Sequence, residues 1–193
     1  MPNTDSQVVF ETDRLRLRIW REVDCEAFYA VMNTPAVMRY LGGLQTPEQW
    51  RDTYARIAGY QRELGYTFWL VERRDGGELL GFCGLKHINY PGCPNAGDME
   101  VGWRFRESVW GQGIAKEAAI ATLDHAFATL GAPFVVALTF EVNRASWGLM
   151  ERLGMRYRPE LDFVDPRFAN MGPTKQWQID AADWPAARAA ALS

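Results

Sequence analysis

The chain has 193 residues, of which 48% are hydrophobic and 23% are charged, a composition typical of a globular protein and not of a disordered one. Its formal net charge of −3 argues against a nucleic-acid partner, because such binding needs basic patches that displace counterions. The length suits one domain with a sizeable core. We therefore predict a single domain over residues 1–193, with a core at residues 10–180 and tails at residues 1–9 and 181–193.

The three cysteines, Cys25, Cys83 and Cys93, are odd in number and have no CxxC spacing. The opening letters MPNTDSQVVF lack the basic and apolar regions of a signal peptide. No apolar run approaches the roughly 20 residues of a membrane span. We expect free thiols in a reducing cytoplasm and no membrane partner.

The elements predicted first lie before residue 65. RLRLRIW, residues 14–20, alternates strictly, which predicts a strand with its leucines on one face and its three arginines on a solvated face. Asp24 is predicted to cap a helix, and Pro35 begins a short helical turn. A longer helix is predicted from Pro47 to about Leu64.

After residue 65 the hydrophobic period changes. YTFWLVERR, ELLGFCGLKHI and DMEVGWRFR are predicted as three successive strands. A helix follows from about Gly113 to Leu130, and PFVVALTF after it is short enough for a strand buried on both faces. NRASWGLMERLG is predicted as a compact helix, MRYRPELDF and TKQWQID as closing strands, and the tail as a frayed helical turn. This order implies an α/β sheet of mixed direction.

Two glycines, Gly111 and Gly113, stand between the third of these strands and an alanine-rich helix. Glycines without Cβ, next to helical N–H groups that have no intrahelical partner, can form a concave surface for a phosphate or pyrophosphate. A tight turn that needs glycine for backbone reasons alone is the alternative. The nucleotide-binding patterns GxxxxGK[ST] and GxGxxG are both absent.

The run EVGWRFRESVWGQGIAKEA, followed by NRASWGLMERLGM, resembles the acetyl-coenzyme A binding region of the GNAT superfamily of N-acetyltransferases. ETDRLRLRIWREVDCEAFYAVMNTPAVMRYL and ELLGFCGL are similar to its RimJ/RimL branch, the ribosomal-protein-alanine acetyltransferases. The resemblance implies a mostly antiparallel twisted sheet, flanked by helices and splayed between the fourth and fifth predicted strands. It also implies acetyl-coenzyme A as co-substrate, with no metal.

The resemblance also implies the residues that bind the cofactor. Where the usual motif begins with Gln or Arg, this chain has Trp110, which this branch commonly allows. The turn would hold the pyrophosphate, and the strand before it would offer backbone groups to the pantetheine. The implied residues are Trp103, Arg104, Phe105, Gly111, Gln112, Gly113, Ile114, Ala115, Lys116, Asn143 and Ser146.

Asn143 matches the superfamily's asparagine that binds the pantetheine or phosphate arm, and it is equally suited to cap the helix behind it. Seven residues later the superfamily tyrosine protonates the departing thiolate, but this chain has Met150 there. Ser146, on the same helical face, is the implied replacement, and water or a purely structural serine are the alternatives.

An ammonium has no lone pair, so acetyl transfer to an amine needs a proton acceptor. The resemblance places Glu100 in this role, with Asp98 as the alternative and His87 as a weaker one. Cys83, His87 and Cys93 lie close in sequence but match no zinc pattern, so we predict no metal. Cys83 falls in a predicted core strand, where a buried thiol is inert.

The acceptor is left open by the sequence. Residues 38–50, 66–69 and 90–97 are predicted to line its side of the site. A protein N-terminal α-amine is what the branch implies, and a polyamine, amino acid or aminoglycoside is the alternative. Because Met150 replaces the tyrosine, a non-catalytic coenzyme A sensor is a further alternative. Exposed sheet edges pair between subunits in many such domains, so a homodimer is also an expectation.

Overall fold

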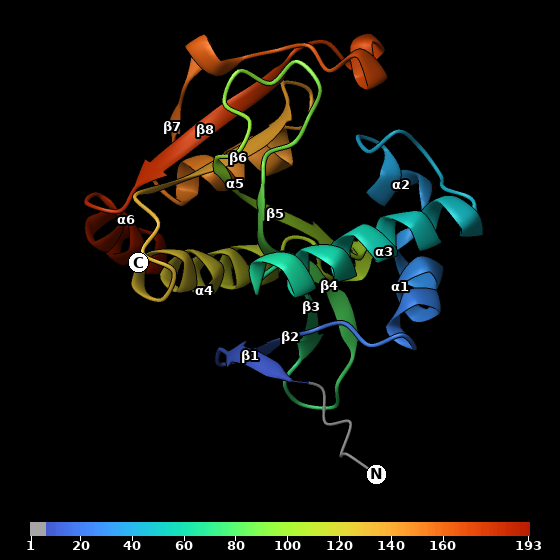
Figure 1. Cartoon of the computed structure of the whole chain (residues 1–193). Helices are drawn as coiled ribbons and strands as arrows, with labels where there is room; N and C mark the ends of the chain where they lie inside the picture. Colours follow the sequence, from blue (N-terminus) through green and yellow to red (C-terminus); the bar gives the residue numbers. More distant parts are fainter. Residues whose placement is uncertain (1–6) are drawn as a thin grey trace. The chain divides into compact units, whose positions relative to one another are not determined.

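The computed structural model describes residues 7–193 (Figure 1). Residues 1–6, which belong to the predicted tail and to the segment compared with signal peptides, lie outside the described residues. The chain divides into two compact units. Unit 1 contains the chain up to Gly84 and Trp103–Ala121, and unit 2 contains Leu85–Gly102 and Thr122–Ser193. The prediction of a single domain stays a prediction, and each unit is described by itself.

The strands of unit 1 form an antiparallel meander. Leu15 and Leu17 are fully buried, as their alternation predicts, and Leu17 lies opposite Val71 in the next strand. The first strand was not predicted, because its four residues are only partly buried and carry no clear alternation. The strands are β1 (Val8–Glu11), β2 (Leu15–Arg18), β3 (Phe68–Arg73), the first part of β4 (Leu79–His87) and the last part of β5 (Met99–Phe105).

Three helices precede β3, namely α1 (Asp24–Met32), α2 (Pro35–Met38) and α3 (Pro47–Leu64). The prediction for α3 is confirmed at both ends. Thr46 and Gln49 form a capping box at its start, and Gly65 closes it with φ of 79°. Helices α1 and α3 cover one face of the unit 1 strands, and the shared core includes Phe28, Trp50 and Phe82 (Figure 1).

The predicted roles of Arg18 and Asp24 were wrong. Asp24 is the first residue of α1, whose N-cap is Val23, and its carboxylate is buried. Arg18 is 2% exposed and donates to Asp24 (2.6 and 2.9 Å) and to Glu72 on β3 (2.8 Å). The arginines of β2 therefore do not share a solvated face, because two buried carboxylates draw one of them inside.

The strands of unit 2 are the end of β4, the start of β5, then β6 (Phe134–Phe140), β7 (Arg156–Tyr157) and β8 (Thr174–Asp180). β6 runs parallel to β5, with Glu100 opposite Val136, and antiparallel to β8, with Phe134 opposite Asp180. Five of the seven residues of β6 are buried, which agrees with its apolar sequence.

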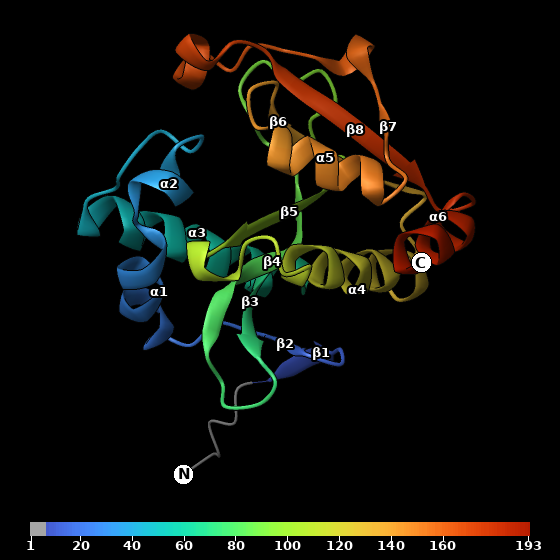
Figure 2. The same ribbon diagram turned by 180° about the vertical axis from the view of Figure 1, so that it is seen from behind.

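The helices of unit 2 lie before and after β6 in the sequence. α4 (Ile114–Ala128) begins in unit 1 and ends in unit 2, and α5 (Arg144–Arg152) lies against β6 and β8 (Figure 2). The tail forms α6 (Trp184–Leu192) and not the predicted frayed turn. Trp184 is buried and donates through Nε1 to Asp124 on α4 (2.8 Å), so the tail helix is anchored.

Pairing in the sheet follows the order β1-β2-β3-β4-β5-β6-β8-β7, with β5 and β6 parallel and the other recorded pairs antiparallel. This confirms the predicted fold class, a mixed and mostly antiparallel sheet flanked by helices. The predicted splaying of β5 and β6 stays a prediction. None of the helices in the described residues is long and apolar enough to cross a membrane.

Candidate functional site

The glycine turn lies in unit 1 between β5 and α4. A short 3-10 helix, η1 (Glu107–Val109), follows β5, and the turn then leads directly into Ile114. Gly111 has φ of 73° and Gly113 has φ of 75°, whereas no other residue type among the described residues has positive φ. Both glycines are therefore needed for the backbone path, since a side chain there costs about 1–2 kcal/mol.

One side chain distant in the sequence, Arg14, and two local hydrogen bonds hold this turn. The Gln112 carbonyl accepts from Arg14 Nη1 (3.0 Å), and Gln112 Nε2 donates to the Ser108 carbonyl (2.8 Å). Trp110 Nε1 donates to the Phe105 carbonyl (2.8 Å), which ties the turn back to β5. Arg14 was not predicted at this turn, because nothing local in the sequence connects it with a residue 98 positions away.

The start of α4 points N–H groups toward this turn. The first intrahelical bond runs from Glu117 N to Gly113 O (3.0 Å), so Ile114, Ala115 and Lys116 come before the helical ladder is complete. Burial opposes ionisation of Glu117, but hydrogen bonds from Thr12 and Arg14 outweigh it and hold its pKa below the ordinary value. The turn and helix start suit an anion, with the macrodipole adding positive potential.

On β5, Trp103 and Arg104 are half-buried and Phe105 is buried. A Cβ on Gly81 of β4 would lie 2.1 Å from the Arg104 carbonyl, so the strands approach closely and glycine is required there. The backbone groups predicted to meet the pantetheine therefore lie on a strand that is fixed on its β4 side.

Glu100 lies in unit 2 in a cluster of buried polar groups. Its Oε2 is 2.9 Å from Lys86 Nζ, and Tyr90 Oη donates to its Oε1 at 3.0 Å. Lys86 Nζ also lies 4.1 Å from the centre of the Tyr90 ring. Oε2 has no partner in hydrogen-bonding geometry, so the contact with Lys86 is an ion pair rather than a directed hydrogen bond. The cluster holds the carboxylate in one orientation.

The two alternative bases have different surroundings. Asp98 accepts from Asn95 Nδ2 (2.9 Å), and its carbonyl accepts from Ile88 N (2.9 Å). His87 Nδ1 is 2.6 Å from the Gly97 carbonyl. Both residues therefore help to shape the loop between β4 and β5, and neither belongs to the buried cluster around Glu100.

Asn143 and Ser146 meet at the start of α5 in unit 2. The Asn143 side chain accepts from Ser146 N at 3.4 Å, so the predicted capping role is confirmed, while a role toward the cofactor stays a prediction. Ser146 is half-buried. Met150, where the resemblance implies a tyrosine, is 1% exposed and fills core volume.

A family model described as an acetyltransferase (GNAT) domain matches residues 14–156. The chain belongs to the GNAT acetyltransferase family. It is therefore an acetyl-transferring enzyme with a fold that binds acetyl-coenzyme A. This membership accords with a glycine turn that follows β5 and η1 and opens α4.

Relatives and solved structures agree with this membership. The chain is 34% identical to Bacillus subtilis YkkB over 147 residues, covering 76% of this chain and 84% of that protein. It is 29% identical over 150 residues to the N-acetyltransferase YoaA of Bacillus subtilis, covering 77% and 82%. An Agrobacterium tumefaciens acetyltransferase structure is 27% identical, with a TM-score of 0.73 over 88% of this chain and 92% of that one.

Mycobacterium smegmatis RimJ, solved in complex with CoA-disulfide, is similar in fold. Its TM-score is 0.70 and its identity 18%, over 92% of this chain and 87% of that one. Other GNAT structures are at least as similar, so this likeness shows the fold and not the branch.

The sequence predicts neither a metal site nor a thiol nucleophile, and the structure shows where the relevant side chains lie. Within residues 7–193, no group of three or more His, Cys, Asp or Glu side chains could hold a metal ion. Cys83 is fully buried on β4, and burial raises the pKa of the Cys93 thiol. Burial disfavours the reactive thiolate, and the absence of metal and thiol chemistry stays a prediction.

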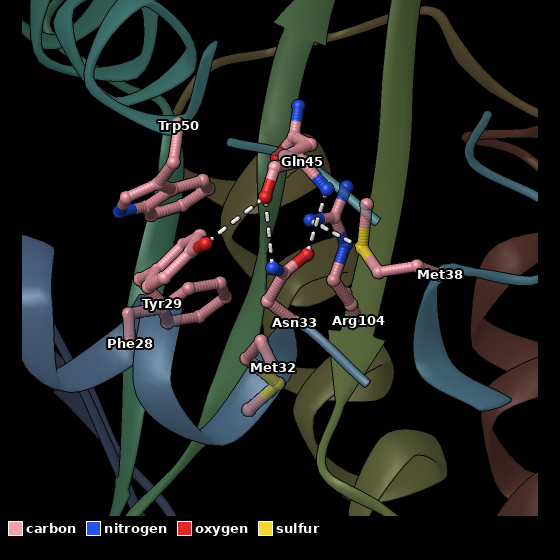
Figure 3. Close-up of a pocket in the computed structure, with 8 residues that line it drawn as sticks. All are labelled: Phe28, Tyr29, Met32, Asn33, Met38, Gln45, Trp50 and Arg104. Atoms are coloured by element: carbon pink, nitrogen blue, oxygen red, sulfur yellow. Dashed lines mark hydrogen bonds between the residues drawn. The ribbon is translucent and has the colours of Figure 1, made fainter. Parts of the chain in front are cut away.

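A small pocket in unit 1 lies beside β5 of this GNAT domain (Figure 3). Its wall comes from α1, α2, the start of α3, the loop between the last two, and β5. Part of the segment 38–50 predicted to line the acceptor side belongs to it. The lining residues are Phe28, Tyr29, Met32, Asn33, Met38, Gln45, Trp50 and Arg104.

Proposed function

We propose that this GNAT enzyme transfers the acetyl group of acetyl-coenzyme A to a primary amine, with the pyrophosphate bound at the glycine turn. The observation that carries the proposal is the turn itself: two positive-φ glycines, Gly111 and Gly113, directly before the first N–H groups of α4. A Cβ on Gly111 would meet nothing within 4 Å, so the turn is open on that side. Its form therefore suits a bulky anion.

The other binding residues follow from the family resemblance. Gln112–Lys116 would surround the pyrophosphate through backbone N–H groups, and Trp103–Phe105 would pair with the pantetheine as an added strand does. Asn143 would bind the same arm with the amide hydrogens that its capping oxygen leaves available. Acetyl-coenzyme A supplies the activated acyl group when bound.

Glu100 is our proposed proton acceptor for the incoming ammonium, directly or through water. Lys86 and Tyr90 fix its carboxylate from two sides, at 2.9 and 3.0 Å. A fixed carboxylate can accept a proton without first reorganising, which is what general base catalysis requires. Asp98 remains the alternative base, although its side chain is bonded within the β4–β5 loop.

Protonation of the departing thiolate falls to Ser146 or to water. Met150 has no proton to donate and is buried in the core, so the usual tyrosine has no substitute at its own position. Ser146 is half-buried one turn earlier on α5.

The identity of the acetyl acceptor and membership of the RimJ/RimL branch are also proposals. The motif resemblance to the RimJ/RimL branch supports a protein N-terminal α-amine, and a small-molecule amine is the alternative. Free cysteines support action in the reducing cytoplasm. The sheet begins with β1 and ends with β7, so an edge strand could pair with a second copy in a homodimer.

Two measurements test the function. Isothermal titration with acetyl-coenzyme A should show binding, and the absence of binding at millimolar cofactor would overturn the proposal. Release of coenzyme A thiol should then be followed against a panel of peptides and small amines. Turnover with at least one amine is expected, whereas tight cofactor binding without turnover on any amine would favour a sensor.

A further inference from the structure

Arg14 connects the turn between β1 and β2, residues 12–14, with the glycine turn. Its Nη1 donates to the Gln112 carbonyl at 3.0 Å. Its Nη2 lies 3.5 Å from the place where a Cβ on Gly113 would stand. All of these residues belong to unit 1. The guanidinium therefore lies directly against the peptide that joins Gln112 to Gly113.

Glu117, in the first turn of α4, holds this guanidinium in place. Its Oε2 accepts from Arg14 Nε at 2.6 Å, and its Oε1 accepts from Arg14 N at 3.1 Å and from the Thr12 hydroxyl. Glu117 N also donates to the Gly113 carbonyl at 3.0 Å, so the same residue is bonded to the glycine turn. The Arg14 side chain is 46% exposed, yet charge-assisted bonds to one carboxylate fix its position.

The peptide between Gln112 and Gly113 has two accessible orientations. Gly113 can take φ of either sign at little cost, so no side chain prevents this peptide from turning over. In a trans peptide the C=O and the N–H point in opposite directions. Because the Gln112 carbonyl is bonded to Arg14, the Gly113 N–H points away from the guanidinium. Arg14 therefore selects one of the two orientations.

This orientation matters for an anion at the turn. The Gly113 N–H is one of the backbone donors that we propose for the pyrophosphate, and such donors attract anions. The reversed peptide would present its carbonyl oxygen instead, an acceptor whose partial negative charge repels a phosphate. Glu117 balances the charge of Arg14, so the contribution of Arg14 to the turn is orientation rather than net positive charge.

We propose that Arg14 is a positioning residue for the cofactor. It holds the peptide between Gln112 and Gly113 with the N–H available to the pyrophosphate of acetyl-coenzyme A. Arg14 acts through the backbone and need not touch the phosphate itself. This inference rests on the proposed binding of acetyl-coenzyme A at the glycine turn.

Isothermal titration with acetyl-coenzyme A tests the role of Arg14. Arg14→Gln should raise Kd by about 10-fold, because the charged hydrogen bond that selects the peptide orientation is lost. The KM for acetyl-coenzyme A should rise with it, whereas kcat at saturating cofactor should stay close to the wild-type value. Arg14→Lys keeps the charge without the planar fork, so it should restore only part of the affinity.

Arg74→Gln is the matched control. Arg74 Nη1 donates to the Thr12 carbonyl at 3.1 Å, so this change also removes a guanidinium bonded to the turn between β1 and β2. Its Kd for acetyl-coenzyme A should equal that of the wild type. An unchanged Kd in Arg14→Gln, or an equal rise in both variants, would overturn the inference.

A second measurement follows the Gly113 N–H directly by NMR. In protein made with isotopically labelled glycine, the resonance that is missing from Gly113→Ala identifies this amide. Acetyl-coenzyme A should move it downfield in the wild type and move it less in Arg14→Gln, or in Arg14→Lys if the glutamine variant does not fold. A Gly113 resonance that saturating cofactor leaves unmoved in the wild type would overturn the inference. If the wild type binds no acetyl-coenzyme A, the proposed function fails instead.

Discussion

Two buried carboxylates, one in each unit, have different kinds of partner. In unit 1, Asp24 accepts from Arg18 at 2.6 and 2.9 Å and from Arg21 N at 2.7 Å. In unit 2, Glu100 has the Tyr90 hydroxyl at 3.0 Å and the Lys86 ammonium at 2.9 Å, the latter outside hydrogen-bonding geometry. Both side chains are buried, so exposure does not distinguish them.

The difference lies in the partners. Burial opposes ionisation of Asp24, but hydrogen bonds from Arg18 and Arg21 prevail and lower its pKa to about 2. Arginine keeps its proton at all ordinary pH values, so this carboxylate is fixed as an anion. Glu100 instead accepts one hydrogen bond, from the Tyr90 phenol, and forms an ion pair with the Lys86 ammonium. We therefore assign Asp24 to stability and propose chemistry for Glu100.

The largest expected effect comes from Glu100→Gln. The amide keeps the shape but cannot accept the amine proton, so kcat should fall by about 10²- to 10⁴-fold at neutral pH. Acetyl-coenzyme A affinity, measured by isothermal titration, should change little. The control is Glu72→Gln, which alters the buried partner of Arg18 and should lower stability but not kcat. An unchanged rate and pH–rate profile in Glu100→Gln would remove Glu100 from the base role.

Asp24→Asn should have the next largest effect, on stability. The change leaves the 2%-exposed Arg18 with less compensation, and breaking a buried pair costs about 3–5 kcal/mol. Because Glu72 still accepts from Arg18, we expect a value near the lower end, about 3 kcal/mol. Urea unfolding measures it, with the exposed Asp52→Asn as a control that should shift stability by less than about 0.5 kcal/mol. A loss as small as the control's would contradict the structural role.

The same carboxylate predicts how stability depends on pH. Its pKa is lowered from 3.8 to about 2, so its contribution is complete above pH 4 and is lost as the pH falls through 2. The linked loss is about 2 kcal/mol. Urea unfolding between pH 5 and pH 2 should show this fall in the wild type and a smaller one in Asp24→Asn. An equal loss of stability in the wild type and in Asp24→Asn would contradict the role of Asp24 in this pH dependence.

The smallest expected effects come from replacing the glycines near the two ends of α4. Gly113 and Gly131 have φ of 75° and 65°, and a Cβ on Gly113 would meet only the Arg14 side chain, at 3.5 Å. Alanine at either position should therefore cost about 1–2 kcal/mol of stability through backbone strain. Only Gly113→Ala should also weaken acetyl-coenzyme A binding, since Gly131 lies at the far end of the helix. Equal affinities in the two variants would separate the turn from the cofactor.

Local signals in the sequence predicted much of this fold. The start of α3 was predicted from Pro47 after Thr46, and the Thr46–Gln49 capping box and the closing Gly65 lie at its ends. The glycine turn was found in the same way, because positive φ restricts residue type at the position itself.

Side-chain partners that lie far away in the sequence explain the wrong predictions for Arg18 and for the C-terminal tail. Arg18 was placed on a solvated face because one of its carboxylate partners, Glu72, lies 54 residues away, and the nearer one, Asp24, was predicted only as a helix cap. The tail was predicted to fray because Trp184 meets Asp124 only through the tertiary fold, 60 residues distant. At the candidate site, Glu100 was chosen by resemblance, but its partners Lys86 and Tyr90 were not. They meet it through the pairing of β4 with β5 and the loop between these strands, which composition does not reveal.

The central claim is that this enzyme moves an acetyl group from acetyl-coenzyme A to an amine nitrogen. Isotope-labelled acetyl-coenzyme A, incubated with the amine panel and followed by mass spectrometry, tests it most directly. We expect one labelled acetyl group on the acceptor nitrogen with the wild type and a strongly reduced yield with Glu100→Gln. Thiol release without a labelled amine product would mean hydrolysis, and it would contradict the claim.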